Sequence, residues 1–332
     1  MNKKLAIKPP KINKTYLLAA LLCTIIVLSC AVTYAKVQAA PIQKTVYVVT
    51  GIDTESPSGK FINSTDGQPD MDIDLFSTYP VSSITRVFDS SFRQSTRDSY
   101  SNAIKLTWFV EMDYLTSKSL FYNATHLTGF SGYTALLDLM QTNWGTQIQS
   151  YGDSLEYHHH FQYYSDGIWK VAEHGPDASY PGYQMSALDK MIIDRSFYPS
   201  SFRSGWDLQS VPLSNWLEQW IPFDFSPLHT ASGWYPSNEY PGMNHYQAQT
   251  AHFSYYADIQ SAFTKARNQG SSIFSFYMHC YDNMTGEINY LQSTLNSIAS
   301  IYTDVTFKYV TAAQAMQLAL GYNDVTPPTF TV

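Results

Sequence analysis

The chain has 332 residues, which is enough for one large domain or two of ordinary size. Its first 39 residues hold six of the 20 basic residues and none of the 27 acidic ones, so the rest of the chain carries a formal net charge of −13. This acidic balance excludes a nucleic-acid partner, because phosphate recognition needs basic surface.

Residues 1–40 have the pattern of an export sequence. Five lysines lie within the first 14 residues, and residues 15–35 contain no charged residue. A basic start followed by an apolar run is typical of a signal peptide or a membrane anchor. This run is long enough to span a bilayer, whereas residues 37–39 fit a cleavage site. We therefore predict an exported protein, either secreted or held at the cell surface by its N-terminal segment in the membrane.

From residue 41 onward, apolar β-rich runs alternate with segments of helical periodicity. We expect strands at residues 45–50, 104–110, 153–161, 201–203, 221–226, 272–278 and 305–310. We expect helices at residues 133–142, 187–194, 214–220, 256–268, 287–302 and 311–320. This alternation favours a parallel sheet joined by crossover helices.

The sequence thus predicts an α/β domain over residues 41–322, followed by a tail or linker at residues 323–332. About seven parallel strands fit either an open doubly wound sheet or a barrel. The barrel is favoured by polar residues at or just beyond the C-terminal ends of the predicted strands. These residues are Asp53, Glu55, His158, His160, Arg203, Asp224 and His279. In a parallel barrel such ends form one rim, where active sites are built.

Three consecutive histidines, residues 158–160, close the third predicted strand. Residues two apart on a strand point to the same face, so His158 and His160 are expected to converge. Two imidazoles on one face, with a carboxylate from the neighbouring strand end at Asp53 or Glu55, form a typical metal site. The alternative is a histidine cluster that lies on the surface or has its hydrogen bonds satisfied in the core.

Two insertions break the alternation of strands and helices. Residues 56–102 are long and polar and are expected to fold over or beside the rim. Residues 227–252 are expected to form a loop that carries Trp234 and Tyr235 among Gly, Pro and Ser. With Trp206, these rings are predicted to bind substrate by stacking on sugars, although packing of the loop onto the barrel would also account for them.

The rim motifs follow a recognisable order. They are Asp53-Thr54-Glu55, His158-His159-His160, Ser201-Phe202-Arg203, Phe223-Asp224-Phe225 and Met278-His279-Cys280. This order resembles the polysaccharide deacetylase family (the NodB homology domain, carbohydrate esterase family four) over residues 45–320. The resemblance implies a distorted (β/α) barrel that removes acyl groups from N-acylated sugars with the help of a metal ion.

The same resemblance implies catalytic roles for the rim residues. Asp53 is the expected general base, although its role and that of Glu55 are open to exchange. Arg203 is expected to hold the base in place, and His279 to protonate the departing nitrogen. Asp224 matches the fourth motif of the family, while Asp282 competes with it as the carboxylate that orients His279.

The predicted metal ligands are Glu55, His158 and His160. The family spaces its two histidines four residues apart, but position 162 is Gln here, so the pair must be two apart. The implied cofactor is a divalent metal, with zinc the first choice and cobalt or nickel as alternatives. The implied partner is a polysaccharide or oligosaccharide substrate.

Two other functions fit parts of the sequence. A glycoside hydrolase would use paired carboxylates from Asp53, Glu55 and Asp224, but the histidine pair would then have no chemical role. A non-catalytic glycan-binding protein on the same barrel would account for the altered first and second motifs. Acetate release, release of reducing ends, and binding without product distinguish the three functions.

Overall fold

The structure of the protein is a computed structural model. It describes residues 44–54, 84–112, 133–159, 162–165, 168–171, 186–205, 220–226, 233–236, 244–247, 250–252, 254–280 and 282–321. The predicted export segment, residues 1–40, and the predicted tail, residues 323–332, lie outside these ranges. Within the ranges, no helix combines the length and the apolar character needed to cross a bilayer.

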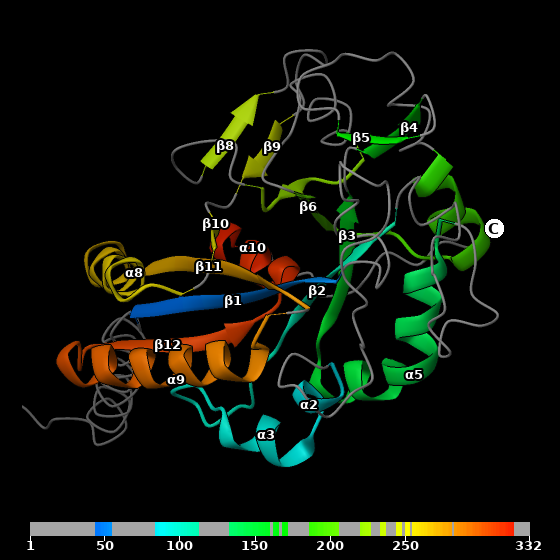
Figure 1. Cartoon of the computed structure of the whole chain (residues 1–332). Coiled ribbons are helices and arrows are strands. Elements are labelled where there is room, and N and C mark those ends of the chain that lie inside the picture. The colour runs from blue at the N-terminus through cyan, green and yellow to red at the C-terminus, as the bar shows by residue number, and fades with distance from the viewer. Residues whose placement is uncertain are drawn as a thin grey trace, which may run out of the picture. The chain divides into compact units, whose positions relative to one another are not determined.

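A curved, mostly parallel sheet organises the domain (Figure 1). Its strands follow the order β10 (Thr250–His252), β11 (Ser271–His279), β1 (Lys44–Thr54), β2 (Thr107–Glu111), β3 (Ser154–His159), β6 (Ser201–Ser204), β7 (Phe223–Asp224), β9 (Asn244–Gln247) and β8 (Gly233–Pro236). Strand β12 (Val305–Val310) pairs with the N-terminal half of β1, and β2 pairs with its C-terminal end. Pairing along the path is parallel except between β8 and β9.

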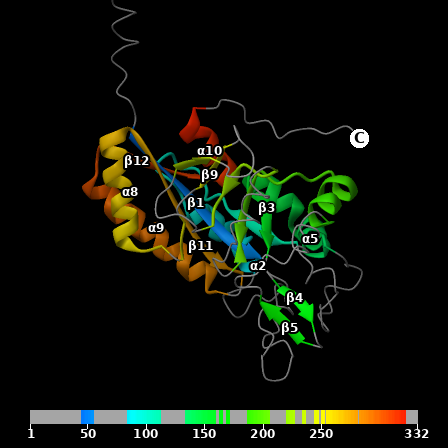
Figure 2. The same cartoon turned by 90° about the horizontal axis from the view of Figure 1, so that it is seen from above.

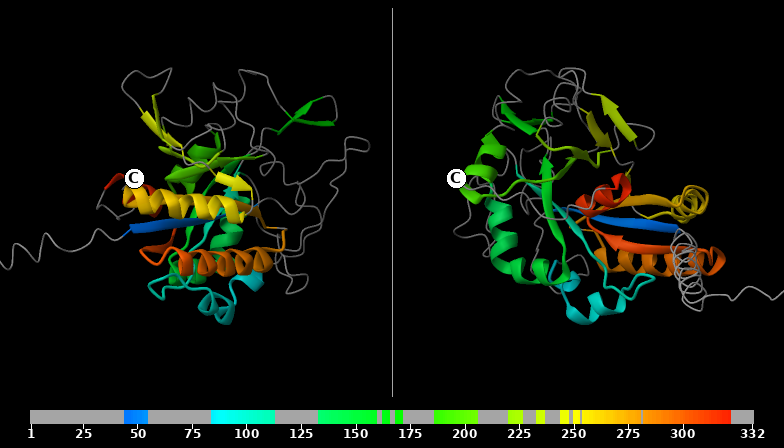
Figure 3. Two further views of the ribbon diagram at one scale, coloured as in Figure 1. Left: turned by 90° about the vertical axis from the view of Figure 1, so that its left-hand side faces the viewer. Right: turned by 180° about the vertical axis from the view of Figure 1, so that it is seen from behind.

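The strands curl into a half-barrel, as two further views show (Figure 3). All seven predicted strands are present and pair in parallel, so the predicted distorted (β/α) barrel is confirmed. A separate antiparallel hairpin, formed by β4 (Gln162–Ser165) and β5 (Ile168–Val171), lies apart from this sheet (Figure 2).

The helices are α2 (Ile84–Val87), α3 (Ser90–Ser95), α5 (Ala135–Tyr151), the π-helix η1 (Lys190–Asp194), α8 (Tyr256–Gln269), α9 (Met284–Ile301) and α10 (Ala312–Leu320). They confirm the predicted helices except that at 214–220, which falls almost entirely outside the described residues. Helix α10 shows how sequence sets the boundaries. Thr311 and Gln314 form a capping box at its start, and Gly321 ends it with a left-handed φ of 72°.

Strand alternation gives the sheet an inner and an outer face. On β1, Val46, Val48 and Ile52 belong to the large outer core with helices α5, α8 and α9. Val49 belongs instead to a smaller inner core that includes Phe109 and residues of α10. Because side chains alternate along a strand, Asp53 shares the inner face with Val49. Asp53 therefore lies on the inner face of the barrel, at its C-terminal rim.

The two predicted insertions differ from expectation. The second, residues 227–252, was expected as a loop but contains β8, β9 and β10, all three of which belong to the main sheet. Aromatic residues favour strands, and Trp234 pairs with Tyr246 in the β8–β9 ladder. The first, residues 56–102, was expected to fold over or beside the rim, and its residues 56–83 lie outside the described part of the chain. Residues 84–102 pack instead at the opposite end of the strands, where Arg93 binds Asp153 just before β3 begins.

Glu156 fixes the alignment of β3 with β6. Its carboxylate accepts hydrogen bonds from the backbone N–H groups of Ser200 and Ser201, each at 2.9 Å, and from the Ser200 hydroxyl at 3.1 Å. These contacts hold the first residues of β6 against β3. The resulting register places His158 beside Arg203. The placement of His158 next to Arg203 thus depends on the Glu156 carboxylate, two residues before His158 on β3.

We expect Glu156 to make stability depend on pH. Burial raises the pKa of its carboxyl from 4.5 to about 7, against the opposing effect of the serine hydrogen bonds. The folded protein then keeps a proton that the unfolded chain has released, so the free energy of unfolding falls as pH rises from about 4.5 to about 7, by up to about 3 kcal/mol. Glu156→Gln should remove this slope in urea unfolding measured across that window. Equal slopes in both proteins would contradict the assignment.

Candidate active site

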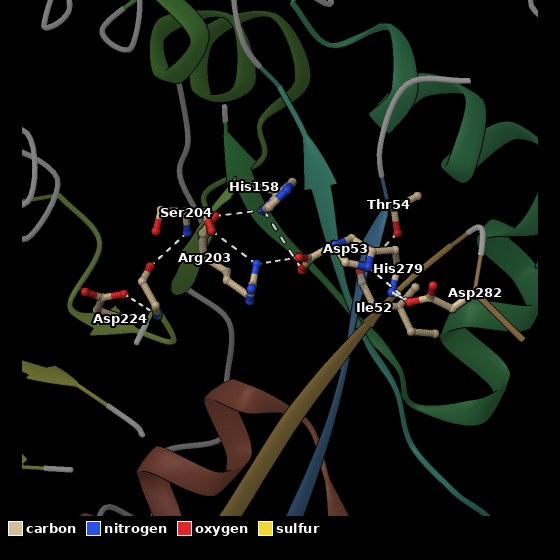
Figure 4. A network of polar contacts seen from close by, with 10 residues as sticks. Ile52, Asp53, Thr54, His158, Arg203, Ser204, Asp224, His279 and Asp282 are labelled. Carbon is tan, nitrogen blue, oxygen red and sulfur yellow. Dashed lines mark hydrogen bonds and ion pairs between the residues drawn. The ribbon is translucent and has the colours of Figure 1, made fainter. Parts of the chain in front are cut away.

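Asp53 and Arg203 form a buried ion pair on the inner face of the rim (Figure 4). Asp53 is the penultimate residue of β1 and Arg203 lies on β6, and both side chains are about 1% exposed. Nη1 of Arg203 donates to Oδ2 of Asp53 and to the carbonyl oxygen of Ser204. Oδ1 of Asp53 has no hydrogen-bond partner among the described residues. One carboxylate oxygen is therefore held, and the other is available to water, metal or substrate.

His158 lies beside this free oxygen. Its Nδ1 is 4.0 Å from Oδ1 of Asp53 and 2.8 Å from the carbonyl oxygen of Arg203. Because a carbonyl oxygen can only accept, Nδ1 carries the proton and the lone pair of the neutral ring lies on Nε2. A hydrogen bond from the other ring nitrogen to a backbone carbonyl commonly orients a metal-binding histidine. His158 thus has the tautomer that a metal ligand requires.

His159 belongs to the other face of β3. Its ring stacks on that of Tyr157 with the ring centroids 5.3 Å apart, and its centroid lies 6.2 Å from that of Phe202. Both of these residues are in the outer core. Strand alternation therefore divides the histidine run as the sequence predicts, with His158 facing the site and His159 facing the core. His160, the next residue, falls outside the described part of the chain.

His279 ends β11 next to Asp53 on the neighbouring strand. Its Nδ1 lies 3.0 Å from Oδ2 of Asp282, and the same oxygen accepts the His279 backbone N–H at 2.7 Å. The carboxylate fixes the ring and keeps the proton on Nδ1. Of the two carboxylates considered for this role, Asp282 is the one in contact with His279.

Asp224 lies on the far side of Arg203 from His279 (Figure 4). Its Oδ1 accepts the backbone N–H of Ser226 at 2.6 Å, and the Ser226 hydroxyl accepts the backbone N–H of Ser204 at 2.8 Å. Through these two bonds Asp224 supports the end of β6, which carries Arg203. Its contacts therefore suit a positioning role, and its predicted place in catalysis stays a prediction.

The remaining predicted site residues have no described side chains. Glu55, His160 and Trp206 lie outside the described residues, and Trp234 and Tyr235 are placed only as backbone of β8. Within the described ranges, no group of three or more histidine, cysteine or acidic residues is arranged to hold a metal. Two of the three predicted metal ligands are outside those ranges, so the predicted metal site is not tested.

Sequence reasoning missed two further residues of the site. Glu111 is buried at the end of β2, where it is paired in register with His158. It directly follows the predicted strand 104–110. The strand-end rule, which selects polar residues at or just beyond the C-terminal ends of predicted strands and which selected Asp53, would therefore also have selected Glu111. Tyr277 contacts both Arg203 and His279. No local signal marks it, because Arg203 is 74 positions away and belongs to a different strand.

The sequence matches no protein-family model and no curated protein. Among solved structures it resembles PuuE allantoinase, at 10% identity with a TM-score of 0.47, covering 86% of this chain and 94% of that one. It also resembles a probable polysaccharide deacetylase from Pseudomonas aeruginosa PAO1, at 11% identity with a TM-score of 0.46, covering 82% and 90%. Similarity at this level assigns no activity to the chain, and the fold rests on the strand order described above.

Proposed function

We propose that the protein is a metal-dependent hydrolase that removes acetyl groups from N-acetylated sugars of a polysaccharide. One observation carries the proposal, namely a buried carboxylate with one oxygen held by Arg203 and the other facing His158. His279 lies on the adjacent strand in register with that carboxylate. A base, a metal-ligand candidate and an acid thus come together at the rim of the barrel, where such chemistry is usually placed.

The described residues fit a divalent metal. His158 offers Nε2, with its tautomer set by the Arg203 carbonyl, and Asp53 offers a buried oxygen that has no hydrogen-bond partner among the described residues. Imidazole nitrogen and carboxylate oxygen are the donors that zinc, cobalt and nickel accept. We assign His158, together with Glu55 and His160, to the metal. Once bound, the ion would polarise the acyl carbonyl and lower the pKa of attacking water.

The protein's own residues account for the proton transfers. Asp53 takes a proton from the attacking water at Oδ1, while Arg203 holds Oδ2 and so fixes the direction of the carboxylate. His279 gives a proton from Nε2 to the departing amine, because Nδ1 is engaged with Asp282. The scheme requires no covalent intermediate.

The acidic, tyrosine-rich composition supports a neutral sugar as the substrate, since few cations are available to bind an anion. We assign Trp206, Trp234 and Tyr235 to sugar stacking at the rim. The basic and apolar N-terminal residues support export, so the substrate would be a polysaccharide of the cell wall or of the extracellular space.

The test begins with metal content. We expect the purified full-length protein, loaded with zinc, to retain about one equivalent after dialysis. His158→Gln should lose it, whereas His159→Gln should keep it, because the second ring faces the outer core. Atomic absorption gives the stoichiometry, and circular dichroism checks that both variants fold. Equal retention by the two variants would remove His158 from the metal site.

Product analysis then separates the three functions. The zinc-loaded protein should release acetate from an N-acetylated glucosamine oligosaccharide without creating new reducing ends. New reducing ends without acetate would identify a glycosidase, and affinity without either product would identify a glycan-binding protein. No metal uptake with zinc, cobalt or nickel would overturn the hydrolytic mechanism.

A further inference from the structure

We infer that Tyr277 is a positioning residue, whose aromatic face fixes the Arg203 guanidinium and thereby the direction of the Asp53 carboxylate. The catalytic consequence rests on the proposed function, but the contact does not. The centre of the guanidinium lies 3.2 Å from the centroid of the Tyr277 ring. The Arg203 edge, in contrast, donates to Asp53 and to the Ser204 carbonyl. Edge and face together fix both the direction and the plane of the group.

The position of Tyr277 in the barrel explains how it reaches Arg203. Tyr277 is paired in register with Gly51, two residues below the level at which Asp53 pairs with His279. Its ring therefore lies beneath the catalytic level, on the inner face. Gly51 has no side chain at this level, and a Cβ there would lie 3.0 Å from the ring of Phe109. The bare backbone of β1 at this level thus leaves room for the Phe109 ring of the inner core.

Burial makes this contact energetically significant. The Arg203 side chain is 1% exposed and Tyr277 is 5% exposed, so water contributes little to either. A guanidinium removed from water must find replacement interactions for its faces as well as its N–H groups. An aromatic face supplies such an interaction, and the attraction is stronger in a desolvated site than at the surface. Tyr277 thus stabilises the charged group on which Asp53 depends.

Tyr277 also contacts the acid half of the site. Its ring meets that of His279 edge to face, with centroids 5.7 Å apart and planes at 85°. One aromatic ring therefore contacts both halves of the site. It contacts Arg203, the partner of the proposed base Asp53, and His279, the proposed acid that Asp282 orients. Arg203 contacts the aromatic face of Tyr277. Tyr277→Phe keeps this face and Tyr277→Leu removes it, so the two variants are expected to behave differently.

Solution NMR of the full-length protein tests the contact without any assay of activity. The side-chain signals of Arg203, assigned by their loss in Arg203→Lys, should be shifted upfield by the ring current of Tyr277. The shift should persist in Tyr277→Phe and disappear in Tyr277→Leu. Unshifted signals in the wild-type protein would overturn the inference, even if Tyr277→Leu failed to fold.

Kinetics test the consequence. On an N-acetylated glucosamine oligosaccharide, Tyr277→Leu should lower kcat about 10- to 100-fold with little change in KM, because misplaced groups slow the chemical step more than binding. Tyr277→Phe should stay within about threefold of wild type. In an Arg203→Lys background, which lacks the planar group, Tyr277→Leu should add no further loss.

Two kinetic results would contradict a positioning role. One is unchanged kcat in Tyr277→Leu, and the other is the same fold-loss with and without the Arg203→Lys change, since independent effects multiply. A wild-type protein that releases no acetate would instead overturn the proposed function, and the NMR result alone would then decide whether Tyr277 fixes Arg203.

Discussion

Replacing Asp53 with Asn is expected to slow the proposed amide hydrolysis by about 10³-fold, since general-base catalysis contributes on the order of 10² to 10⁴. The amide has nearly the same shape as the carboxylate but cannot take a proton from water. It also carries no charge to match Arg203, which is about 1% exposed. Acetate release by wild type and variant under substrate saturation measures the effect. We expect kcat to fall much more than KM rises, because the group acts in the chemical step.

The metal content of Asp53→Asn settles whether Asp53 and Glu55 exchange roles. If Asp53 is the base, the variant keeps about one equivalent of zinc while losing activity. If Asp53 is the ligand, metal and activity are lost together. Asp304→Asn is the matched control, since this exposed carboxylate binds Lys44 and Arg267 far from the rim. Wild-type turnover by Asp53→Asn would remove Asp53 from both roles.

The strand-end rule was predictive at this site because side chains alternate strictly along a strand. Asp53 and His279 both end apolar strands, and parallel pairing then placed them in register. The same rule brought Arg203 next to His158, with Glu156 holding the register from below. Strand direction and residue parity put these residues on one face at one rim, whereas their exact register depends also on contacts such as those of Glu156.

Other contacts depend on geometry that no local pattern encodes. Asp282 reaches His279 through the tight turn after β11, where its carboxylate accepts the backbone N–H of the histidine. Sequence spacing allowed that contact but did not favour it over Asp224. The stacking of Tyr277 on Arg203 requires the sheet to curl until β11 faces β6. Curvature arises from the packing of the whole sheet, so a contact across it is not readable from either strand.

The strands β9 and β10 were missed for a related reason. Each is only three or four residues long, and Ala248 and Gln249 alone separate the two. Runs this short give no clear periodicity. They become strands because the exposed edges of β7 and β11 offer unpaired backbone groups to which they can bond. Tertiary structure, not local preference, decides such segments.

Asp153→Ala is expected to lower the free energy of unfolding by about 3 to 5 kcal/mol, the usual effect of breaking a buried ion pair. The side chains of Asp153 and Arg93 are both fully buried. The carboxylate accepts two bonds from Arg93, one from the backbone N–H of Leu106 at 2.9 Å and one from Trp108 Nε1 at 3.0 Å. Its removal leaves a buried guanidinium and two N–H donors without their partner. Urea unfolding followed by tryptophan fluorescence measures the change.

A double variant separates the ion pair from simple loss of packing. Asp153→Leu combined with Arg93→Met removes both charges, so it should be less destabilised than either single change. Asp304→Ala again serves as the control and should have a much smaller effect, because its partners Lys44 and Arg267 are exposed to solvent. A loss below about 1 kcal/mol in Asp153→Ala would show that the network contributes little.

Asp153 immediately precedes β3, whose other end carries His158. Its variants should therefore reduce the folded population while leaving kcat of the folded protein unchanged, the opposite of what we expect for Asp53→Asn.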